Sequence, residues 1–265
     1  IGFTTVGLKI DAGHEVMLAE AWLASCYWSD APCKRSGAAA RSIAVQINGN
    51  DHYLSNVIVF DFASVGVEVN GAANLLSAVH TWNGGGTGIS LGTNASSYGA
   101  HQNRLLGCYL DYNTLDLWDP SDVLVESTFF LQTHARLRPL KGVVDGLVMR
   151  YNSYTTGQSV VLDGAFTSAS GVLISDENGA AKATRAKRSL ALTAASTWHF
   201  DFSDVLLFPS LPIQQVQYSF VFDSRDAFRE HAALKPQGTT VDVVTFGPKS
   251  SGTNGTVHIE VAQAI

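Results

Sequence analysis

The chain has 265 residues, a formal net charge of −6, 15% charged residues and 46% hydrophobic residues. This length and this apolar content are enough for a sizeable core in one compact chain. The acidic balance argues against a nucleic-acid partner, because phosphate binding needs a basic face. No apolar run approaches the roughly 18 residues that span a bilayer, so we do not expect a membrane-embedded protein.

A short pattern returns four times near the N-terminus: glycine or alanine, then apolar, polar and apolar residues, then a polar turn. It covers 7–11, 44–48, 66–70 and 88–92. Repeats at such spacing are typical of stacked architectures, in which each unit buries its apolar edge against its neighbours. Because strand side chains alternate, the repeats predict two inward columns and one outward column. The inward columns are Leu8, Val45, Val67, Ile89 and Ile10, Ile47, Val69, Leu91, and the outward column is Lys9, Gln46, Glu68, Ser90.

A second apolar strand follows each of these repeats after a polar bend. The bends fall near residues 52, 74, 103, 122 and 145. Nothing between them has helical periodicity or the length of a crossover helix. The pattern therefore predicts an all-β chain, a right-handed parallel β-helix over residues 1–195.

The hydrophobic pattern of the sequence changes from about Thr197. Segments 198–202, 205–209, 213–222, 240–246 and 256–261 read as antiparallel strands separated by Pro and Gly, and 223–235 as a helical turn or a loop. We therefore expect a C-terminal antiparallel β appendage over residues 196–265. A basic cluster precedes it, formed by Lys182, Arg185, Lys187 and Arg188. We interpret this cluster as a solvated loop, with capture of an acidic sugar as the alternative.

Several features bear on where the protein works. Cys26 and Cys33 flank a step that contains Pro32, which predicts a disulfide, whereas Cys108 lies in a predicted strand and is expected to be a buried free thiol. Asn94 and Asn254 each begin a glycosylation triplet. These signals favour a secreted glycoprotein in the extracellular space or cell wall.

The chain opens at Ile1, inside what reads as a rung of the β-helix. An uncovered first rung would expose strand edges and core residues. We therefore expect earlier coils, or other chains, to complete or cap this end of the solenoid.

Four longer runs carry a resemblance to a known family. They are 49–53, 71–83, 104–111 and 201–209, and they resemble the Quartet-type pectin-lyase-like proteins of plants and algae. The resemblance covers nearly the whole chain, including the appendage. It implies a right-handed parallel β-helix and a distant kinship with polygalacturonases, which hydrolyse pectin with aspartates.

The usual polygalacturonase motifs are absent from this sequence. It has no Asn-Thr-Asp, no Asp-Asp pair, no Gly-His-Gly turn and no Arg-Ile-Lys triplet. The catalytic residues therefore cannot be carried over by resemblance. A glycoside hydrolase needs two carboxylates, and carboxylates that follow the second strands are the candidates in this sequence. Asp61 and Asp111 are the candidate acid and base, stacked two rungs apart with Asn83 between them, and turn-forming roles are the alternative.

The remaining candidates are aromatic and imidazole side chains. Trp28 and Trp82 could stack on sugar rings, together with His80 and Asn83 as further substrate contacts, although core-covering roles explain them as well. No metal-ligand spacing is present, so we predict neither a metal nor a cofactor. Two hypotheses stay open: a secreted glycoside hydrolase acting on a cell-wall glycan, and a non-catalytic β-helix that binds glycan or serves as a structural subunit of an extracellular assembly.

Overall fold

The computed structural model describes residues 6–24, 43–62, 64–82, 86–93, 100–156, 159–175, 178, 182–223, 229–246 and 252–265. The chain divides into two compact units. The first comprises residues 1–166 and 171–181, and the second comprises residues 167–170 and 182–265. All elements in the described residues are β-strands.

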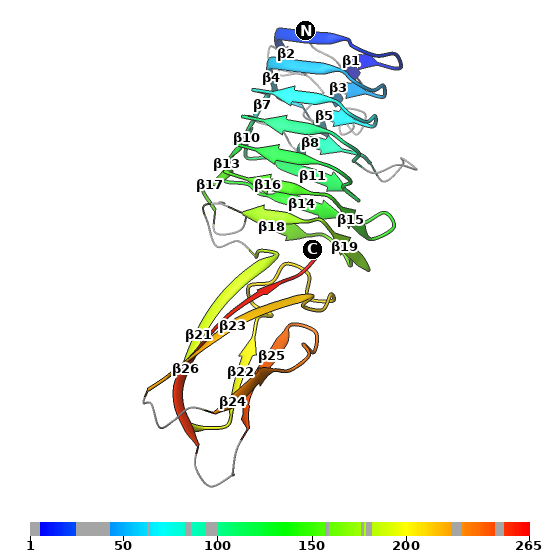
Figure 1. The fold of residues 1–265 in the computed structure, drawn as a ribbon. Helices are drawn as coiled ribbons and strands as arrows, with labels where there is room; N and C mark the ends of the chain where they lie inside the picture. Colours follow the sequence, from blue (N-terminus) through cyan, green and yellow to red (C-terminus); the bar gives the residue numbers. More distant parts are fainter. Residues whose placement is uncertain are drawn as a thin grey trace. The chain divides into compact units, whose positions relative to one another are not determined.

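The first unit is a parallel β-helix whose rungs follow one another along the chain (Figure 1). One of its sheets, sheet A, takes a single strand from each rung and is parallel throughout. Its strands are β1 (Val6–Ile10), β3 (Ile43–Ile47), β5 (Val65–Val69), β8 (Thr87–Leu91), β11 (Thr114–Trp118), β14 (Ala135–Arg138) and β18 (Val160–Leu162).

The second sheet, sheet B, bends between two faces. The first part of β4 (Tyr53–Phe60) pairs with β6 (Leu75–Ser77), which defines the B1 face, and its second part pairs with β7 (His80–Trp82), which defines the B2 face. On the B1 face lie β6 (Leu75–Ser77), β9 (Arg104–Leu106), β12 (Leu124–Glu126), β16 (Val148–Arg150) and β20 (Leu173–Ser175). On the B2 face lie β7 (His80–Trp82), β10 (Tyr109–Asp111), β13 (Phe129–Leu131) and β17 (Ser153–Tyr154), while β2 (Met17–Ala24) and β4 (Tyr53–Phe60) run across both faces. Two further short strands are β15 (Val143–Asp145) and β19 (Ser168–Ser170).

The predicted columns of sheet A are confirmed by its register. Leu8 pairs with Val45, Val45 with Val67, and Val67 with Ile89. The second inward column and the outward column follow the same register. Val45, Val67 and Ile89 are fully buried. Alternation along five-residue strands is enough to fix which side chains form the core.

The bends between sheet A and the B1 face contain a ladder of buried polar side chains. The backbone N–H of His52 donates to Asn74 Oδ1, and that of Asn74 donates to Asn103 Oδ1, both at 2.9 Å. All three side chains are fully buried. They satisfy backbone donors that the turns leave unpaired, so their role is structural.

Each rung turns its corners with residues in the left-handed backbone region. The corner before the B1 face uses Asp51, Ala73, Gln102 and Asp122, the corner between the B1 and B2 faces uses Asn56, Ala78, Ser127 and Tyr151, and the corner after the B2 face uses Asp61, Tyr112 and Gln132. The recurrence of positive φ at equivalent places shows that the corners, like the strands, stack from rung to rung.

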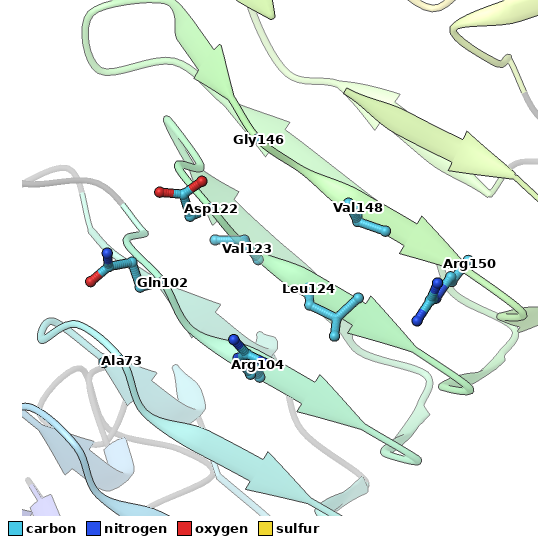
Figure 2. A pocket seen from close by; sticks show the side chains of 9 residues that line it. All are labelled: Ala73, Gln102, Arg104, Asp122, Val123, Leu124, Gly146, Val148 and Arg150. Carbon is cyan, nitrogen blue, oxygen red and sulfur yellow. The ribbon is translucent and has the colours of Figure 1, made fainter. Parts of the chain in front are cut away.

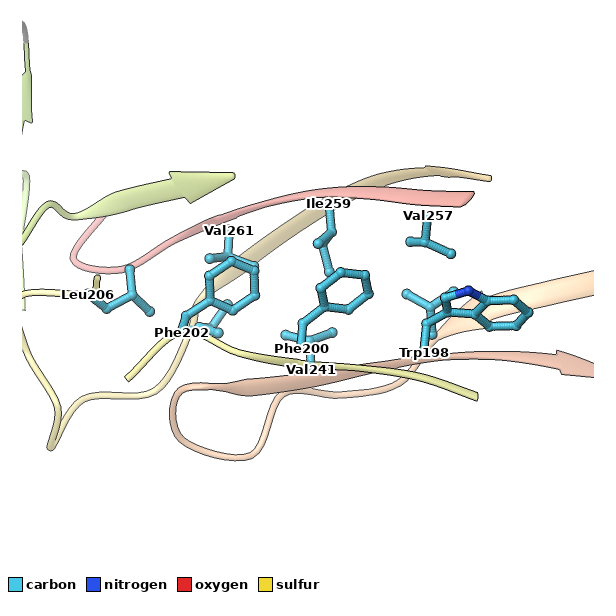
Figure 3. Packing of buried hydrophobic residues seen from close by; sticks show 10 residues of the cluster. Trp198, Phe200, Phe202, Leu206, Val241, Val257, Ile259 and Val261 are labelled. Carbon is cyan, nitrogen blue, oxygen red and sulfur yellow. The ribbon is translucent and has the colours of Figure 1, made fainter. Parts of the chain in front are cut away.

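The second unit contains two antiparallel three-stranded sheets. One is formed by β21 (Arg185–Ala195), β26 (Thr253–Ala262) and β23 (Gln215–Phe222), and the other by β22 (Thr197–Asp201), β25 (Thr240–Phe246) and β24 (Glu230–Ala233). Figure 3 shows Trp198 and Phe200 of β22 pointing toward Val257 and Ile259 of β26, so the core lies between the two sheets. The unit is thus a small β-sandwich.

Several expectations for this region need correction. Residues 205–209 form no strand apart from an isolated bridge at Leu206, whereas part of the segment 223–235 is strand β24. Strand β21 pairs along its length with β26, so the second unit begins earlier than the expected boundary at residue 196. Arg185, Lys187 and Arg188 of the basic cluster belong to β21 and are not in a loop.

Candidate functional site

The B2 face presents two columns of outward side chains. The inward positions between them are the buried residues Val59, Thr81, Leu110 and Phe130. The first outward column is Trp22, Ile58, His80, Tyr109 and Phe129, and the second is Ala24, Phe60, Trp82, Asp111 and Leu131. The face therefore combines rings with one imidazole and one carboxylate.

The rings of this face contact one another from rung to rung. Trp22 meets Phe60 edge-on at 6.4 Å between ring centroids, and Phe60 lies 5.6 Å from Trp82. In the neighbouring column, Tyr109 lies 5.1 Å from Phe129. Trp22 is 72% exposed and Phe129 is 37% exposed, while Trp82 and Tyr109 are half-buried. The rings thus form two runs, one of Trp22, Phe60 and Trp82 and the other of Tyr109 and Phe129, in which all but Phe60 are exposed or half-buried. We call the two runs together the aromatic strip.

The two polar side chains of the strip lie on adjacent strands. His80 Nε2 and Asp111 Oδ1 are both buried and have no hydrogen-bond partner. Burial lowers the pKa of His80, and the charge of Asp111 partly opposes this shift. Burial also raises the pKa of Tyr109, with smaller contributions in the same direction from Asp111 and Tyr112. Both side chains therefore lie at outward positions of the B2 face with an unsatisfied polar atom, although such atoms also occur elsewhere in the described residues, as at His52 Nε2.

The predicted stacking of Asp61 with Asp111 is wrong by one residue. The register aligns Phe60, Trp82 and Asp111. The backbone N–H of Asp61 donates to Trp82 O at 3.2 Å, and that of Tyr112 donates to Leu131 O at 3.0 Å, so Asp61 is equivalent to Tyr112. Asp61 occupies the left-handed corner at φ 54°, half-exposed, whereas Asp111 lies in a strand and is only 8% exposed.

Other predicted site residues have mixed outcomes. Cys108 is a buried free cysteine, as predicted, and burial raises its pKa to about 11. Asn254 lies in strand β26 and not in a turn; its side chain is exposed, and its Oδ1 accepts a hydrogen bond from the N–H of Ala194 at 2.7 Å. Its glycosylation stays a prediction. Cys26, Cys33, Trp28, Asn83 and Asn94 lie outside the described residues.

Sequence reasoning missed most of the aromatic strip. The sequence alone does not point to Trp22, Phe60, Tyr109 and Phe129 as site residues, although each lies at an outward position of its rung. The available signal was the recurrence of a ring at one place in successive second strands. It is weak, because strands β7, β10 and β13 have only three residues each.

A polar groove of about 570 Å³ lies on the outer surface of sheet A. Its lining includes the outward column of Glu68, Ser90, Asp116 and Arg136, with Arg138 and Trp118 beside it. The Asp116 side chain is only 2% exposed and is paired with both arginines. The Arg138 guanidinium lies 4.2 Å from the centroid of the Trp118 ring. We call this feature the A-face groove.

A second open groove, of about 630 Å³, lies on the B1 face. Figure 2 shows Leu124 and Val148 in its middle, with Arg104 on one side and Arg150 on the other. Arg150 donates to Glu126 at 3.2 Å, and its guanidinium lies near the Tyr151 ring. This groove is more apolar in character than the A-face groove, and it contains none of the predicted site residues.

In the described part of the chain, no three His, Cys, Asp or Glu side chains are grouped so as to hold a metal ion. The same residues contain no helix with the length and hydrophobicity needed to cross a membrane.

Comparison with known proteins gives one clear sequence relative. No family model matches the chain. The polygalacturonase QRT3 of Arabidopsis thaliana is 31% identical over 275 residues, a match that covers 98% of this chain. The chain is a divergent polygalacturonase relative. It spans 55% of the length of QRT3. The resemblance to pectin-lyase-like proteins is thereby confirmed, and the parallel β-helix agrees with it.

Solved structures with some likeness to this polygalacturonase relative are phage tailspikes. The tailspike protein gp49 from Pseudomonas phage LKA1 has 11% identity and a TM-score of 0.32, covering 98% of this chain and 61% of its own. The Gp54 tailspike of Acinetobacter baumannii bacteriophage AP22, solved in complex with A. baumannii capsular saccharide, has 8% identity and a TM-score of 0.39, covering 84% and 56%. These are loose similarities, and the fold rests on the strand pairing of this chain.

Proposed function

We propose that this protein is a carbohydrate-binding β-helix that holds a cell-wall or extracellular glycan on its B2 face. The observation that carries the proposal is the aromatic strip, in which exposed and half-buried rings are combined with His80 and Asp111. Ligand sites typically join apolar and aromatic surface with a few polar groups. A pyranose ring matches such a surface, because one of its faces presents C–H groups while hydroxyls surround its edge.

The similarity to a polygalacturonase supports a carbohydrate ligand. A secreted location is part of the same proposal, since a cell-wall glycan is met outside the cell. The exposed rings Trp22 and Phe129 also support a ligand on this face, because large apolar side chains grouped on a protein surface often mark a binding site. A glycan is the ligand that agrees both with the aromatic rings of this face and with the similarity to a polygalacturonase.

Hydrolysis is less well supported than binding. Glycoside hydrolysis uses two carboxylates about 5 to 9.5 Å apart. Among the described outward residues of the B2 strands, Asp111 is the one carboxylate. Asp61 lies beyond the end of strand β4, two rungs away from Asp111. The residue of β4 that is aligned with Asp111 is Phe60, and Asp61 follows it. The strip therefore suits recognition of a sugar better than cleavage of its glycosidic bond.

Binding is tested by isothermal titration calorimetry with oligosaccharides from pectins, galactans, mannuronans and fructans. We expect at least one of them to bind the wild type, and Trp82→Ala and Trp22→Ala each to weaken that binding about tenfold, as for central aromatic contacts. Tyr53→Ala is the matched control, because Tyr53 is an exposed ring in the part of β4 that belongs to the B1 face. If no glycan binds, or if Trp82→Ala and Tyr53→Ala behave alike, the glycan-binding proposal fails and the structural-subunit alternative stands.

A reducing-sugar assay on the same panel tests hydrolysis. If the wild type releases reducing ends and Asp111→Asn abolishes this while glycan affinity is kept, the protein is a hydrolase and Asp111 is part of its chemistry. Binding without any release by the wild type establishes the non-catalytic form of the proposal.

A further inference from the structure

We propose that this protein forms a dimer in which strand β23 of one copy pairs, antiparallel, with β23 of a second copy. The proposal concerns the β-sandwich of the second unit and does not depend on glycan binding. Each three-stranded sheet of the sandwich has two edge strands, which are β21 and β23 in one sheet and β22 and β24 in the other. An edge strand presents unpaired backbone groups, so a further strand can be added there.

The four edge strands differ in how well they are protected. Natural proteins protect an edge by keeping it short or by placing charges, proline or a bulge in it. Strands β22 and β24 have only five and four residues. Strand β21 is long, but it contains three basic residues, and its register with β26 shifts after Leu192. Strand β23 has eight residues, all uncharged and none of them proline, and its register with β26 has no shift. Among the described strands of the sandwich, β23 is therefore the unprotected edge.

The backbone groups on the free side of β23 belong to its even-numbered residues. The N–H of Asp223, directly after the strand, donates to Asn254 O of β26 at 3.2 Å. Because hydrogen-bonded residues alternate in an antiparallel pair, the odd-numbered residues of β23 face β26 and the even-numbered ones face away. In the part of the chain that the structure describes, the N–H and C=O groups of Val216, Tyr218 and Phe220 have no backbone partner. A second strand can pair with all of them.

The same edge exposes apolar side chains. None of the eight side chains of β23 is buried, although Val216, Tyr218 and Phe220 pack against the core of the sandwich. On the outer face of the sheet, Val221 is 53% exposed. A strand paired at this edge would remove part of this apolar surface from water, which favours association.

Contacts with the other sheet hold the edge in place. Tyr218 Oη donates to His231 O of β24 at 3.2 Å. The His231 ring stacks on Phe220 with 5.2 Å between the ring centroids, and Phe220 stacks on Phe222 at 4.5 Å. Because β23 is already ordered by these contacts, a partner strand meets a preorganised edge and little conformational entropy is lost on pairing.

A second copy of β23 is the partner that suits this edge. Two identical antiparallel strands are related by a two-fold axis, and an uncharged strand brings no like charges together when it pairs with itself. Since side chains alternate, the polar side chains of Gln217 and Ser219 meet their own kind on one face, and the rings meet rings on the other. Pairing uses up both free edges, and the remaining edges are protected, so assembly stops at the dimer.

Ser219 lies close to the two-fold axis of this pairing. Even-numbered residues must pair with even-numbered ones, so full overlap of the two strands centres the axis on Tyr218 or on Ser219. The two Ser219 side chains are then directly opposite or diagonal neighbours. Charges introduced at this position therefore face each other across the interface, whichever of the two registers forms.

Sedimentation velocity of the full chain between about 1 and about 100 μM tests the dimer, because an interface of this size is expected to give micromolar affinity. We expect the wild type to shift from monomer to dimer over this range. Ser219→Lys and Ser219→Glu should each weaken dimerisation about tenfold or more, since like charges meet. An equal mixture of the two variants should restore dimerisation. Ser189→Lys is the matched control, because Ser189 and Ser219 flank His258 from opposite sides in the same sheet.

Several results would overturn the proposal. They are a wild type that stays monomeric or forms larger aggregates, a Ser189→Lys variant that dimerises as poorly as Ser219→Lys, and a mixture of the Lys and Glu variants that stays monomeric.

Amide hydrogen exchange of the wild type, followed by NMR, gives a test that needs no variant. The amides of Gln217, Ser219 and Val221 should exchange slowly at all concentrations, because they bond to β26. Those of Val216, Tyr218 and Phe220 should exchange quickly in the monomer and slowly once the dimer forms. A dimer in which these three amides still exchange quickly uses another surface, and the proposal is then wrong.

Discussion

The imidazole of His80 lies flat against the phenol ring of Tyr109, with 4.3 Å between the ring centroids and 2° between the ring planes. The two residues are direct neighbours across the parallel strands β7 and β10. Stacking in this register covers one side of each ring, and it leaves His80 Nε2 buried without a hydrogen-bond partner. The histidine is therefore held in a setting that favours its neutral form.

This setting makes stability depend on pH. Burial lowers the pKa of His80, so the unfolded chain binds a proton more readily than the folded one as the pH falls through the ordinary histidine value of about 6.5. Stability should be fully present above that value and decrease on acidification. The pKa of His134 is also lowered, with burial as the main cause. Urea denaturation at about pH 7.5 and about pH 5 should show a smaller loss in His80→Gln than in the wild type. Equal losses would show that His80 is not responsible.

Asp111→Asn should not destabilise the protein. Asp111 Oδ1 is buried without a partner, so replacing the carboxylate by an amide removes an imperfectly compensated charge. We expect unchanged or higher stability, by up to about 1 kcal/mol. Because the Asp111 charge raises the pKa of His80, the same variant should lower that pKa further, which NMR titration of the imidazole measures. A clear loss of stability would show that the carboxylate accepts hydrogen bonds that matter.

Asp116→Asn should be strongly destabilising. The variant leaves the guanidinium groups of Arg136 and Arg138 facing each other without the carboxylate between them. Removing one partner of a buried ionic network costs on the order of 3 kcal/mol. Denaturant unfolding measures this cost. Asp122→Asn is the matched control, since Asp122 is exposed, and we expect a change within about 0.5 kcal/mol there. Similar values for the two variants would contradict a central role for Asp116.

Cys108 should resist alkylation in the folded protein. Its thiol is buried, and burial raises its pKa to about 11, so little of the reactive thiolate is present or accessible. Incubation with iodoacetamide near neutral pH, followed by peptide mass spectrometry, should find Cys108 unmodified without denaturant and modified in urea. Rapid labelling of the native protein would mean that strand β10 and its preceding turn open readily.

The sequence predicts sheet A better than sheet B. Sheet A strands up to β11 have five residues, so the alternation of Val67, Glu68 and Val69 fixes both face and register. The strands of the B2 face are shorter, and Thr81 occupies a buried position where its hydroxyl bonds to Asn113. An alignment of these rungs by hydrophobicity matches Phe60 and Trp82 with Leu110, and so places Asp61 at the same position as Asp111. The register of the strands instead matches Phe60 and Trp82 with Asp111. A polar residue at an inward position thus explains the one-residue error.

Strand β21 shows the same limitation in the second unit. Arg185 and Lys187 are exposed and alternate with the partly buried Ala186, while Arg188 lies on the same side as Ala186. A cluster of charges in the sequence predicts a loop, although exposed charges at period-two spacing are also typical of an edge strand with one solvated side. Pairing with β26, which lies far away in the sequence, decides the outcome.

The stacked left-handed corners have an evolutionary consequence. Because Asp61, Tyr112 and Gln132 turn the chain in the same way, a duplicated or deleted rung would rejoin its neighbours at matching corners. The protein can therefore change length only in whole steps of about 4.8 Å, the distance between neighbouring strands. Each step would add two positions to the aromatic strip, one in each of its columns, and one position to the outward column of Glu68 and Asp116 at the same time. Gene duplication within such a chain would lengthen both surfaces together, and selection for a longer ligand on one sheet would enlarge the other as a by-product.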